Sequence, residues 1–397
     1  MPELVNYSPF PNFRYYSLDK EGRRFGTVIV KATYAIAPSG RLFVAEEQAP
    51  MMFDDECHGE VNVTSLWHPS DMVPNKPSTD IIVNAVARAP DGQPQSAWTC
   101  GLKVENSEGT VVVSKDLRVT GSRVWQPKWK IPLTEKQKQE WRKHRHAFKG
   151  WELSEAEPIT ELPLHYEYAY GGLLERGPDK NGQPIIDDNA RNPLGRGWID
   201  REFTDHTVPQ PAPQIELASD PVIDPYHGYT PQSLGPIPCA WEPRLPLGGT
   251  LDDDWEKNVW PNWPKDYSFA YHNSAHPDLI CSDYLKGDER IRLLNLCAGS
   301  RELRLDLPGD RMSIDFVRED GSLERKQMNL DTVFLDIAAP ARRDCHVFLT
   351  WRVNFAPGQF AKALIDHITN NQPADQIRRF IHERRATKLK STEGTSA

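Results

Sequence analysis

Proline is the residue that most restricts the fold of this chain. It accounts for 34 of the 397 residues, about 9%, against about 5% in an average protein. Proline breaks the interior of a helix and cannot donate a hydrogen bond within a sheet. The sequence therefore disfavours a bundle of long helices for most of the chain and predicts short strands joined by long, proline-stiffened loops.

Composition and charge narrow the class of protein. The chain has 38% hydrophobic and 26% charged residues, and its formal net charge is -9. An acidic chain has no overall electrostatic attraction to nucleic acid or to an anionic membrane surface, so we expect neither as a partner. Its length predicts about two to three domains and is sufficient to bury a hydrophobic core.

The six cysteines and the N-terminal sequence bear on the compartment. The cysteines have no CxxC spacing and no zinc-binding pattern with histidine, so we expect buried free thiols in a reducing compartment and no metal. The N-terminus lacks a basic segment followed by an apolar one, and no run approaches about 18 apolar residues. The sequence thus predicts a cytoplasmic protein without a signal peptide or a membrane span.

Period-two patterns predict a mainly β fold made of antiparallel, sandwich-like units. Residues 25–36 alternate in this way and are rich in β-branched side chains, and they belong to an expected N-terminal β unit over residues 1–130. Short, evenly spaced strands around the hairpin turn Asp320-Gly321 predict a second β unit over residues 286–356. No clear linker separates the two units, which leaves open that they pack into one body.

The middle and the end of the chain are less regular. Residues 131–285 begin with a basic segment whose capping box predicts a helix over 134–149, and a loop region rich in proline and tryptophan follows. Within that region residues 162–170 are expected to form one strand. Residues 357–390 are expected to form two C-terminal helices and a basic tail, the first helix spanning 359–369.

The sequence contains no familiar catalytic or cofactor motif. A phosphate-binding loop, a dinucleotide fingerprint, a nucleophile elbow and HExxH are all missing, so we predict no cofactor and no catalytic residue. The acidic pairs Asp187-Asp188 and Asp253-Asp254 leave one alternative open, a carbohydrate-active hydrolase, because glycoside hydrolysis uses two carboxyl groups. Adjacent acids in turns more often serve as turn and capping residues, so the non-catalytic interpretation is preferred.

The aromatic loops carry the clearest indication of function. Tryptophan and arginine in stiff loops are typical of protein-binding hot spots, and stiff loops lose little entropy on binding. Neighbouring acids can steer a basic partner segment. The alternative is that most of these tryptophans form a core beneath the loops. The candidate protein-binding residues are Trp198, Trp241, Arg244, Asp253, Asp254, Trp255, Trp260 and Trp263.

A set of ordered motifs resembles one bacterial family. Among these motifs are VKATYAI at 30–36, KPSTDIIV at 76–83, LPLHYEYAYGG at 162–172, NPLGRGW at 192–198 and LGPIPCAWEPR at 234–244. The set is similar to a family long classed as a domain of unknown function and encoded beside type VI secretion effectors and spike proteins. The resemblance covers about residues 1–350. It implies a cytoplasmic adaptor, or chaperone, that binds a toxic effector and helps to load it on the valine-glycine-repeat spike protein.

The sequence departs from that family's pattern at polar positions. Ser122 stands where the family usually has an acid before an arginine, here Arg123, and Tyr168 stands where it usually has an arginine. A further polar motif of the family appears here as APQIE at 212–216. If these groups formed an active site, part of it is missing in this chain; the alternative is that they are buried ion pairs. The departures therefore favour an adaptor over an enzyme.

Overall fold

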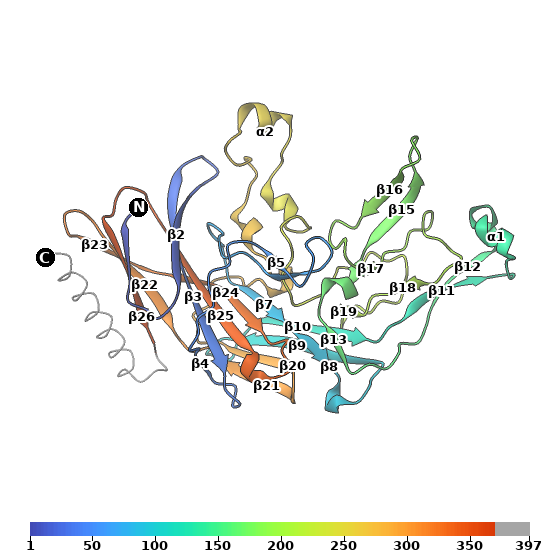
Figure 1. Cartoon of the computed structure of the whole chain (residues 1–397), viewed down its shortest axis with the longest axis horizontal. Helices are drawn as coiled ribbons and strands as arrows, with labels where there is room; N and C mark the ends of the chain where they lie inside the picture. Colours follow the sequence, from blue (N-terminus) through green and yellow to red (C-terminus); the bar gives the residue numbers. More distant parts are fainter. Residues whose placement is uncertain (370–397) are drawn as a thin grey trace.

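The computed structural model describes residues 1–369, and β-sheets dominate it (Figure 1). Its central sheet comprises six strands: β2 (Asn12–Leu18), β3 (Arg24–Ile36), β4 (Leu42–Val44), β7 (Asp80–Asn84), β24 (Asn329–Asp336) and β25 (His346–Phe355). The long strand β3 pairs with β25 antiparallel, whereas β24 pairs with β7 in parallel. Strands from the two ends of the chain therefore lie next to each other in one sheet.

A second, five-stranded sheet also combines distant parts of the chain. Its strands, in order across the sheet, are β19 (Ile215–Leu217), β10 (Val111–Thr120), β9 (Ala97–Glu105), β20 (Arg290–Cys297) and β21 (Ser300–Asp306). Each strand pairs with its neighbour antiparallel. Strands from residues 1–130 and strands from residues 286–356 thus pair with each other in both sheets.

A third, four-stranded sheet contains the end of the described chain. Its order is β1 (Glu3–Asn6), β26 (Lys362–Ile368), β22 (Arg311–Val317) and β23 (Leu323–Gln327). The helix expected over residues 359–369 is wrong, because this segment forms β26 and pairs with β1 and β22. Ala363, Ile365 and His367 are buried in alternation, as in a half-buried strand. The second expected helix and the basic tail lie outside the described residues.

Short elements make up the middle of the chain. The smaller strand groups are β5 (Glu56–Cys57) with β6 (Leu66–His68), β8 (Val86–Arg88) with β13 (Glu161–Pro163), β11 (Val124–Trp129) with β12 (Phe148–Leu153) and β18 (Gln210–Pro211), β14 (Tyr170–Gly171) with β17 (Arg196–Gly197), and β15 (Leu173–Pro178) with β16 (Pro184–Asp188). The helices are α1 (Glu135–Gln139), α2 (Asp253–Asn258) and the 3-10 helices η1 (Pro90–Gly92), η2 (Trp141–Ala147), η3 (Tyr166–Tyr168), η4 (Leu245–Gly248), η5 (Phe269–His272), η6 (Pro277–Leu279) and η7 (Arg342–Asp344). The single strand expected over residues 162–170 is wrong, because β13, η3 and β14 share this segment.

The basic helix expected over residues 134–149 is only partly confirmed. Thr134 and Gln137 form the predicted capping box, and α1 begins after it. The α-helix ends at Gln139, however, and η2 continues the chain in a tighter turn. Trp141 of η2 is buried, so the α-helix ends just before the point where this side chain packs into the protein.

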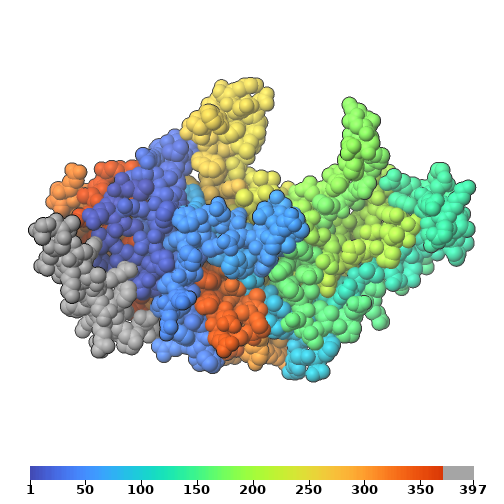
Figure 2. Space-filling model, in the orientation of Figure 1, coloured from blue at the N-terminus to red at the C-terminus, as the bar shows by residue number. Residues whose placement is uncertain are grey.

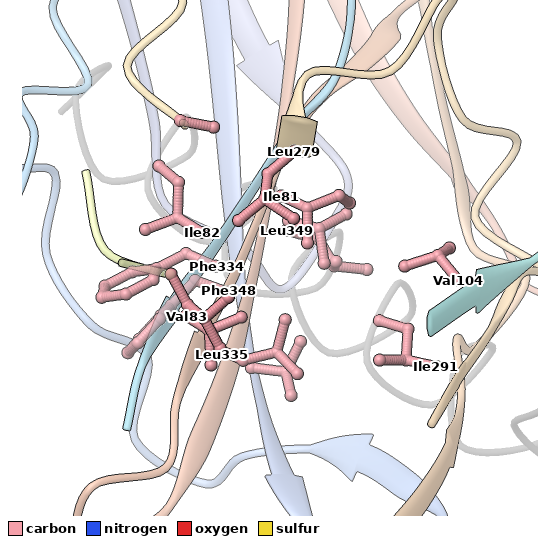
Figure 3. Packing of buried hydrophobic residues seen from close by; sticks show 14 of the residues in the cluster. Ile81, Ile82, Val83, Val104, Leu279, Ile291, Phe334, Leu335, Phe348 and Leu349 are labelled. Carbon is pink, nitrogen blue, oxygen red and sulfur yellow. The ribbon is translucent and has the colours of Figure 1, made fainter. Parts of the chain in front are cut away.

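The main hydrophobic core joins the six-stranded and five-stranded sheets (Figure 3). Ile81 and Leu335 of the first sheet and Val104 and Ile291 of the second belong to one fully buried cluster, together with Leu279 of η6. Burying one such aliphatic side chain contributes roughly 1.5–3 kcal/mol. Because both sheets bury one face in this common core, the two β regions form one body.

The central sheet also buries three ion pairs. All six side chains are less than one tenth exposed, and the pairs are Lys31–Asp71 (2.9 Å), Lys76–Asp80 (2.8 Å) and Arg352–Asp331. Removing a charge from water costs several kcal/mol unless an opposite charge and hydrogen bonds compensate it. Each pair therefore ties a loop or a strand to the sheet in one arrangement.

Asp71→Ala is expected to lower the free energy of unfolding by about 3–5 kcal/mol, because it leaves the ammonium group of Lys31 buried without its counter-charge. Asp306→Ala is the matched control, since Asp306 pairs with Arg290 at the surface and exposed pairs contribute little. Urea denaturation followed by tryptophan fluorescence measures both variants. Equally small effects would contradict a stabilising role for the buried pair.

Candidate functional site

Residues 245–272 form a projecting segment that we call the α2 lobe. It contains five of the eight predicted protein-binding residues: Asp253, Asp254, Trp255, Trp260 and Trp263. The lobe stands out from the body of the molecule around α2 (Figure 1). Figure 2 shows a hollow between the lobe and the β15–β16 hairpin, which is the other projection on this side.

Hydrogen bonds close the base of the α2 lobe. The backbone N–H of Ser268 donates to the carbonyl of Leu247 over 2.9 Å, which joins η5 to η4. The backbone N–H and the hydroxyl of Thr250 donate to the carboxylate of Asp266 over 3.0 and 2.8 Å. The two ends of the lobe are therefore held together by hydrogen bonds.

Aromatic contacts support the interior of the lobe. The ring of Trp263 stacks on that of Tyr267, with centroids 4.6 Å apart and planes 19° apart. The hydroxyl of Tyr267 lies 2.7 Å from Nε2 of His272. The indole N–H of Trp255 donates to the carbonyl of Asn262 over 2.9 Å. These contacts order the segment that carries the outer tryptophans.

The turn between β2 and β3 packs against the lobe. Gly22 of this turn has a φ of +74°, and a Cβ at this position would lie 2.6 Å from Oδ1 of Asn262. The rings of Phe25 and Phe269 also meet edge to face, with centroids 6.1 Å apart. Only glycine allows this approach, so the central sheet supports the lobe from the side.

Trp260 and Trp263 present apolar surface on the outside of the lobe. Their exposed fractions are 66% and 38%, and Leu251 of the same lobe is also exposed. Trp255, by contrast, is half-buried. Large aromatic side chains that stay in water on an ordered loop are typical of contact sites for another protein. These two tryptophans are therefore the members of the predicted set that are placed to act as anchors.

Four of the five acidic residues of the lobe lie at the start of α2. Asp252 caps the helix by accepting the backbone N–H of Trp255 over 2.9 Å. Asp253 and Asp254 follow in the first turn, where the helix dipole favours negative charge, and their side chains are 90% and 65% exposed. Residues 245–272 contain five acidic and two basic residues in all, so the lobe is negatively charged.

Trp241 and Arg244 directly precede the lobe in the chain. Trp241 is 8% exposed and packs edge to face on Tyr166, with ring centroids 5.6 Å apart. Arg244 is buried and donates to the carbonyls of Tyr271 over 3.0 Å and Ile237 over 2.5 Å. Burial lowers the pKa of the Arg244 guanidinium from its usual value. Trp241 and Arg244 are therefore part of the interior beneath the loops, and they attach the lobe to the body of the molecule.

Trp198 lies in a different part of the molecule from the lobe. It is half-buried and packs on a second hydrophobic cluster, and its backbone N–H donates to the carbonyl of Gly171 over 3.2 Å. The buried members of that cluster are Trp125, Tyr170, Ile199, Ala212, Val222 and Tyr229. The structure therefore does not bring Trp198 together with the tryptophans of the α2 lobe.

The two acidic pairs considered for glycoside hydrolysis lie on separate projections (Figure 1). Asp187 and Asp188 end β16, where Asp187 pairs with Arg176, whereas Asp253 and Asp254 belong to α2. Hydrolysis of a glycoside needs two carboxyl groups on either side of the sugar, roughly 5–10 Å apart, one of them kept protonated by its surroundings. The geometry of these four acids does not favour that chemistry.

The polar motif residues around Arg123 form a buried ion pair. Nη2 of Arg123 lies 2.6 Å from Oε2 of Glu216, and both side chains are almost completely buried. Glu216 also pairs with Arg118 and accepts the backbone N–H of Val222 over 2.7 Å. This carboxylate is therefore fully engaged in joining β10 and β19 to the following loop, as expected of a structural group.

Residues 1–369 contain no group of three His, Cys, Asp or Glu side chains placed to hold a metal ion. The six cysteines all lie in this part of the chain, and each is a free thiol. Over the same residues no helix is both long enough and apolar enough to span a membrane.

A family model matches residues 21–352, more than four fifths of the chain. The chain belongs to the DUF2169 family. That family is described as "Uncharacterized protein conserved in bacteria". No curated protein and no solved structure matches the chain. The matched part of this DUF2169 protein includes the α2 lobe, and the family description names no partner, so type VI secretion remains a prediction.

Sequence analysis missed α2 and the residues that support the lobe. The acids around Asp253 and Asp254 are expected to be turn and capping residues, and Asp252 does cap a helix. An aspartate followed by acidic first-turn residues is a helix-start signal that could have revealed α2. Tyr267 and His272 lie in an irregular segment, where no helical or strand periodicity marks them as supporting residues. Only the folded loop shows that they stand beneath Trp263.

Trp241→Ala and Trp260→Ala are expected to differ strongly in stability. Removing the buried indole of Trp241 should lower the free energy of unfolding by about 3–5 kcal/mol, because it leaves a cavity in the core. Trp260→Ala should change it by less than about 0.5 kcal/mol, since the ring is mostly in water. Urea denaturation checks both. A large loss for Trp260→Ala would mean that this ring serves the fold.

The pH dependence of stability should report on His272 at the base of the lobe. Burial lowers the pKa of His272 to about 3, and the positive charges of Arg244, Lys76 and Arg352 lower it further. The unfolded chain takes up this proton near pH 6.5 and the folded chain does not, so stability is full above about pH 6.5 and falls toward pH 3.

His272→Gln should reduce the slope of the unfolding free energy against pH between pH 6.5 and 4. The reduction is at most about 1.4 kcal/mol per pH unit, which corresponds to one proton. The measurement is urea denaturation across this range. Other buried histidines, among them His68 and His276 with pKa values lowered to about 4, keep part of the slope in the variant. An unchanged slope would contradict the burial of a neutral His272.

Proposed function

We propose that this DUF2169 protein is a non-catalytic, cytoplasmic adaptor that binds a type VI secretion effector and helps to load it on the valine-glycine-repeat spike protein. The ordered motifs that resemble the adaptor family support the proposal. The effector contact is the α2 lobe. An adaptor needs a surface that holds its cargo firmly without covalent chemistry and releases it later.

The observation that carries the proposal is the exposure of Trp260 and Trp263 on an ordered lobe. The ring of Trp260 remains mostly in water and that of Trp263 partly so, although the lobe is closed at its base and Trp263 stacks on Tyr267. Tryptophan is the residue type most enriched at hot spots, where one side chain contributes about 2 kcal/mol or more. A lobe that is ordered before binding loses little conformational entropy when the partner docks.

The charge of the lobe supports a basic partner segment. Asp253 and Asp254 are exposed on the same lobe as the outer tryptophans, and their only ion pairs in the described part of the chain are with surface lysines. Such acids attract a basic effector segment during the encounter, and 0.1 M salt largely screens this attraction beyond about 10 Å. The aromatic anchors then hold the bound segment.

The double variant Trp260→Ala/Trp263→Ala is expected to lose at least about tenfold in the yield of effector that co-purifies with it. The experiment co-expresses the adaptor with the toxin encoded beside it and isolates the complex. Leu323→Ala is the matched control, because Leu323 is similarly exposed but lies on β23, away from the lobe. Raising the salt concentration should weaken binding to the wild-type chain.

Several results would contradict the proposal. If the folded double variant and Trp198→Ala retain the wild-type yield, the contact lies elsewhere, and the basic segment 134–149 becomes the next candidate. If no product of the neighbouring genes co-purifies with the wild-type chain, the adaptor function itself fails. Turnover in a glycan-release assay would favour the carbohydrate-active hydrolase.

A further inference from the structure

A surface groove of about 460 Å3 lies at the seam between the four-stranded and six-stranded sheets. This volume is within the range of pockets that hold small ligands. Residues 284–286 form one part of its wall, Arg311 at the start of β22 another, and residues 327–330 a third. The buried ring of Trp351 also lines it. No residue of the α2 lobe is among those that line the groove.

The groove forms where the chain passes from one sheet to the other. β23 ends at Gln327 and β24 begins at Asn329, so the crossing takes one residue (Figure 1). That residue, Met328, is buried, and its backbone N–H donates to the carbonyl of Met312 over 2.9 Å. Because side chains alternate along an extended chain, Gln327 and Asn329 both lie on the exposed side. Two carboxamides therefore line this part of the wall.

Lys286 is carried by a rigid turn. The buried carboxylate of Glu289 accepts the backbone N–H groups of Lys286 over 2.7 Å and Gly287 over 2.9 Å. Gly287 has a φ of +88°, and a Cβ there would lie 3.0 Å from the carbonyl oxygen of Asp310. The position of the Lys286 backbone is thus set before any ligand arrives.

Lys286 and Arg311 are the two charged side chains that line the groove. Both are exposed, and within residues 1–369 neither forms an ion pair. The neighbouring acid Asp310 is buried, and its carboxylate faces Tyr34 and His367 instead. In a chain with a net charge of -9, two unpaired cations at one cavity form a local positive site.

The C-terminal residues of the chain are not complementary in charge to the groove. Ile368 pairs with Arg311 in the sheet, and residues 370–397 follow it in the sequence. They contain six basic and three acidic side chains, the same sign of charge as the groove. Electrostatic repulsion therefore disfavours this segment as the occupant of the groove. It favours an acidic ligand from outside the chain.

We propose that this groove binds the carboxylate groups of an acidic ligand, with Lys286 and Arg311 as the contacts to the anion. The guanidinium of an arginine fits a carboxylate with two parallel hydrogen bonds, and a lysine adds a second positive charge. The amides of Gln327 and Asn329 supply neutral donors, and the ring of Trp351 offers an apolar contact. The inference does not depend on the effector proposal, because different residues carry it.

A fluorescent peptide of alternating glutamate and leucine tests the proposal by fluorescence anisotropy with the full chain. The peptide should bind the wild-type chain, and the double variant Lys286→Ala/Arg311→Ala should raise its dissociation constant at least about tenfold. Lys20→Ala is the control, since Lys20 is another exposed cation in the turn between β2 and β3. A peptide with lysine in place of glutamate should not bind.

Competition with citrate distinguishes the two sources of carboxylate. Displacement of the peptide by citrate supports a small polycarboxylate as the ligand, whereas binding of the peptide without such competition supports an acidic protein segment. The proposal is overturned if neither probe binds at millimolar concentration. It is equally overturned if the double variant, with a melting temperature like that of the wild type, binds the peptide as tightly.

Discussion

The antiparallel pairing of β3 with β25 is the interaction on which the rest of the structure depends. It joins residues more than 300 positions apart, and β3 is buried along most of its length. Gly26 lies directly under the ring of Phe355, where a Cβ would be 2.1 Å from the ring. The entropy cost of closing so long a loop grows only with the logarithm of its length. Each large apolar side chain that the strand pair buries, by contrast, contributes roughly 1.5–3 kcal/mol to stability. The intervening residues are therefore held around one central sheet.

Buried charges connect this sheet to the α2 lobe. The carboxylate of Asp80 on β7 pairs with Lys76 and also accepts the side-chain amide of Asn273 and the backbone N–H of Ser274, each over 2.8 Å. Asn273 and Ser274 directly follow the lobe in the chain. Because Asp80 is fully buried, this anchor cannot exchange its partners for water without a large loss of stability. The lobe can therefore keep exposed tryptophans in place at the surface.

The molecule presents two surfaces of opposite charge that arise from different elements. The α2 lobe combines exposed tryptophans with acids at a helix start. The groove at the seam of two sheets places Lys286 and Arg311 beside two carboxamides. Since no residue is shared, substitutions can alter one surface without altering the other. Buried polar residues in another part of the molecule, such as Arg123 and Glu216, are engaged in a structural ion pair.

The sequence by itself determined the mainly β class, the long strand at residues 25–36 and the capping box at Thr134, because these follow from local periodicity and local hydrogen bonding. Only the tertiary structure decided that residues 362–368 form a strand, since pairing with β1 and β22 outweighs the helical reading of the same residues. It also decided that Trp241 is buried while Trp260 is exposed. Both tryptophans lie in proline-rich loops, and burial depends on which distant residues pack against a side chain, which no local pattern records.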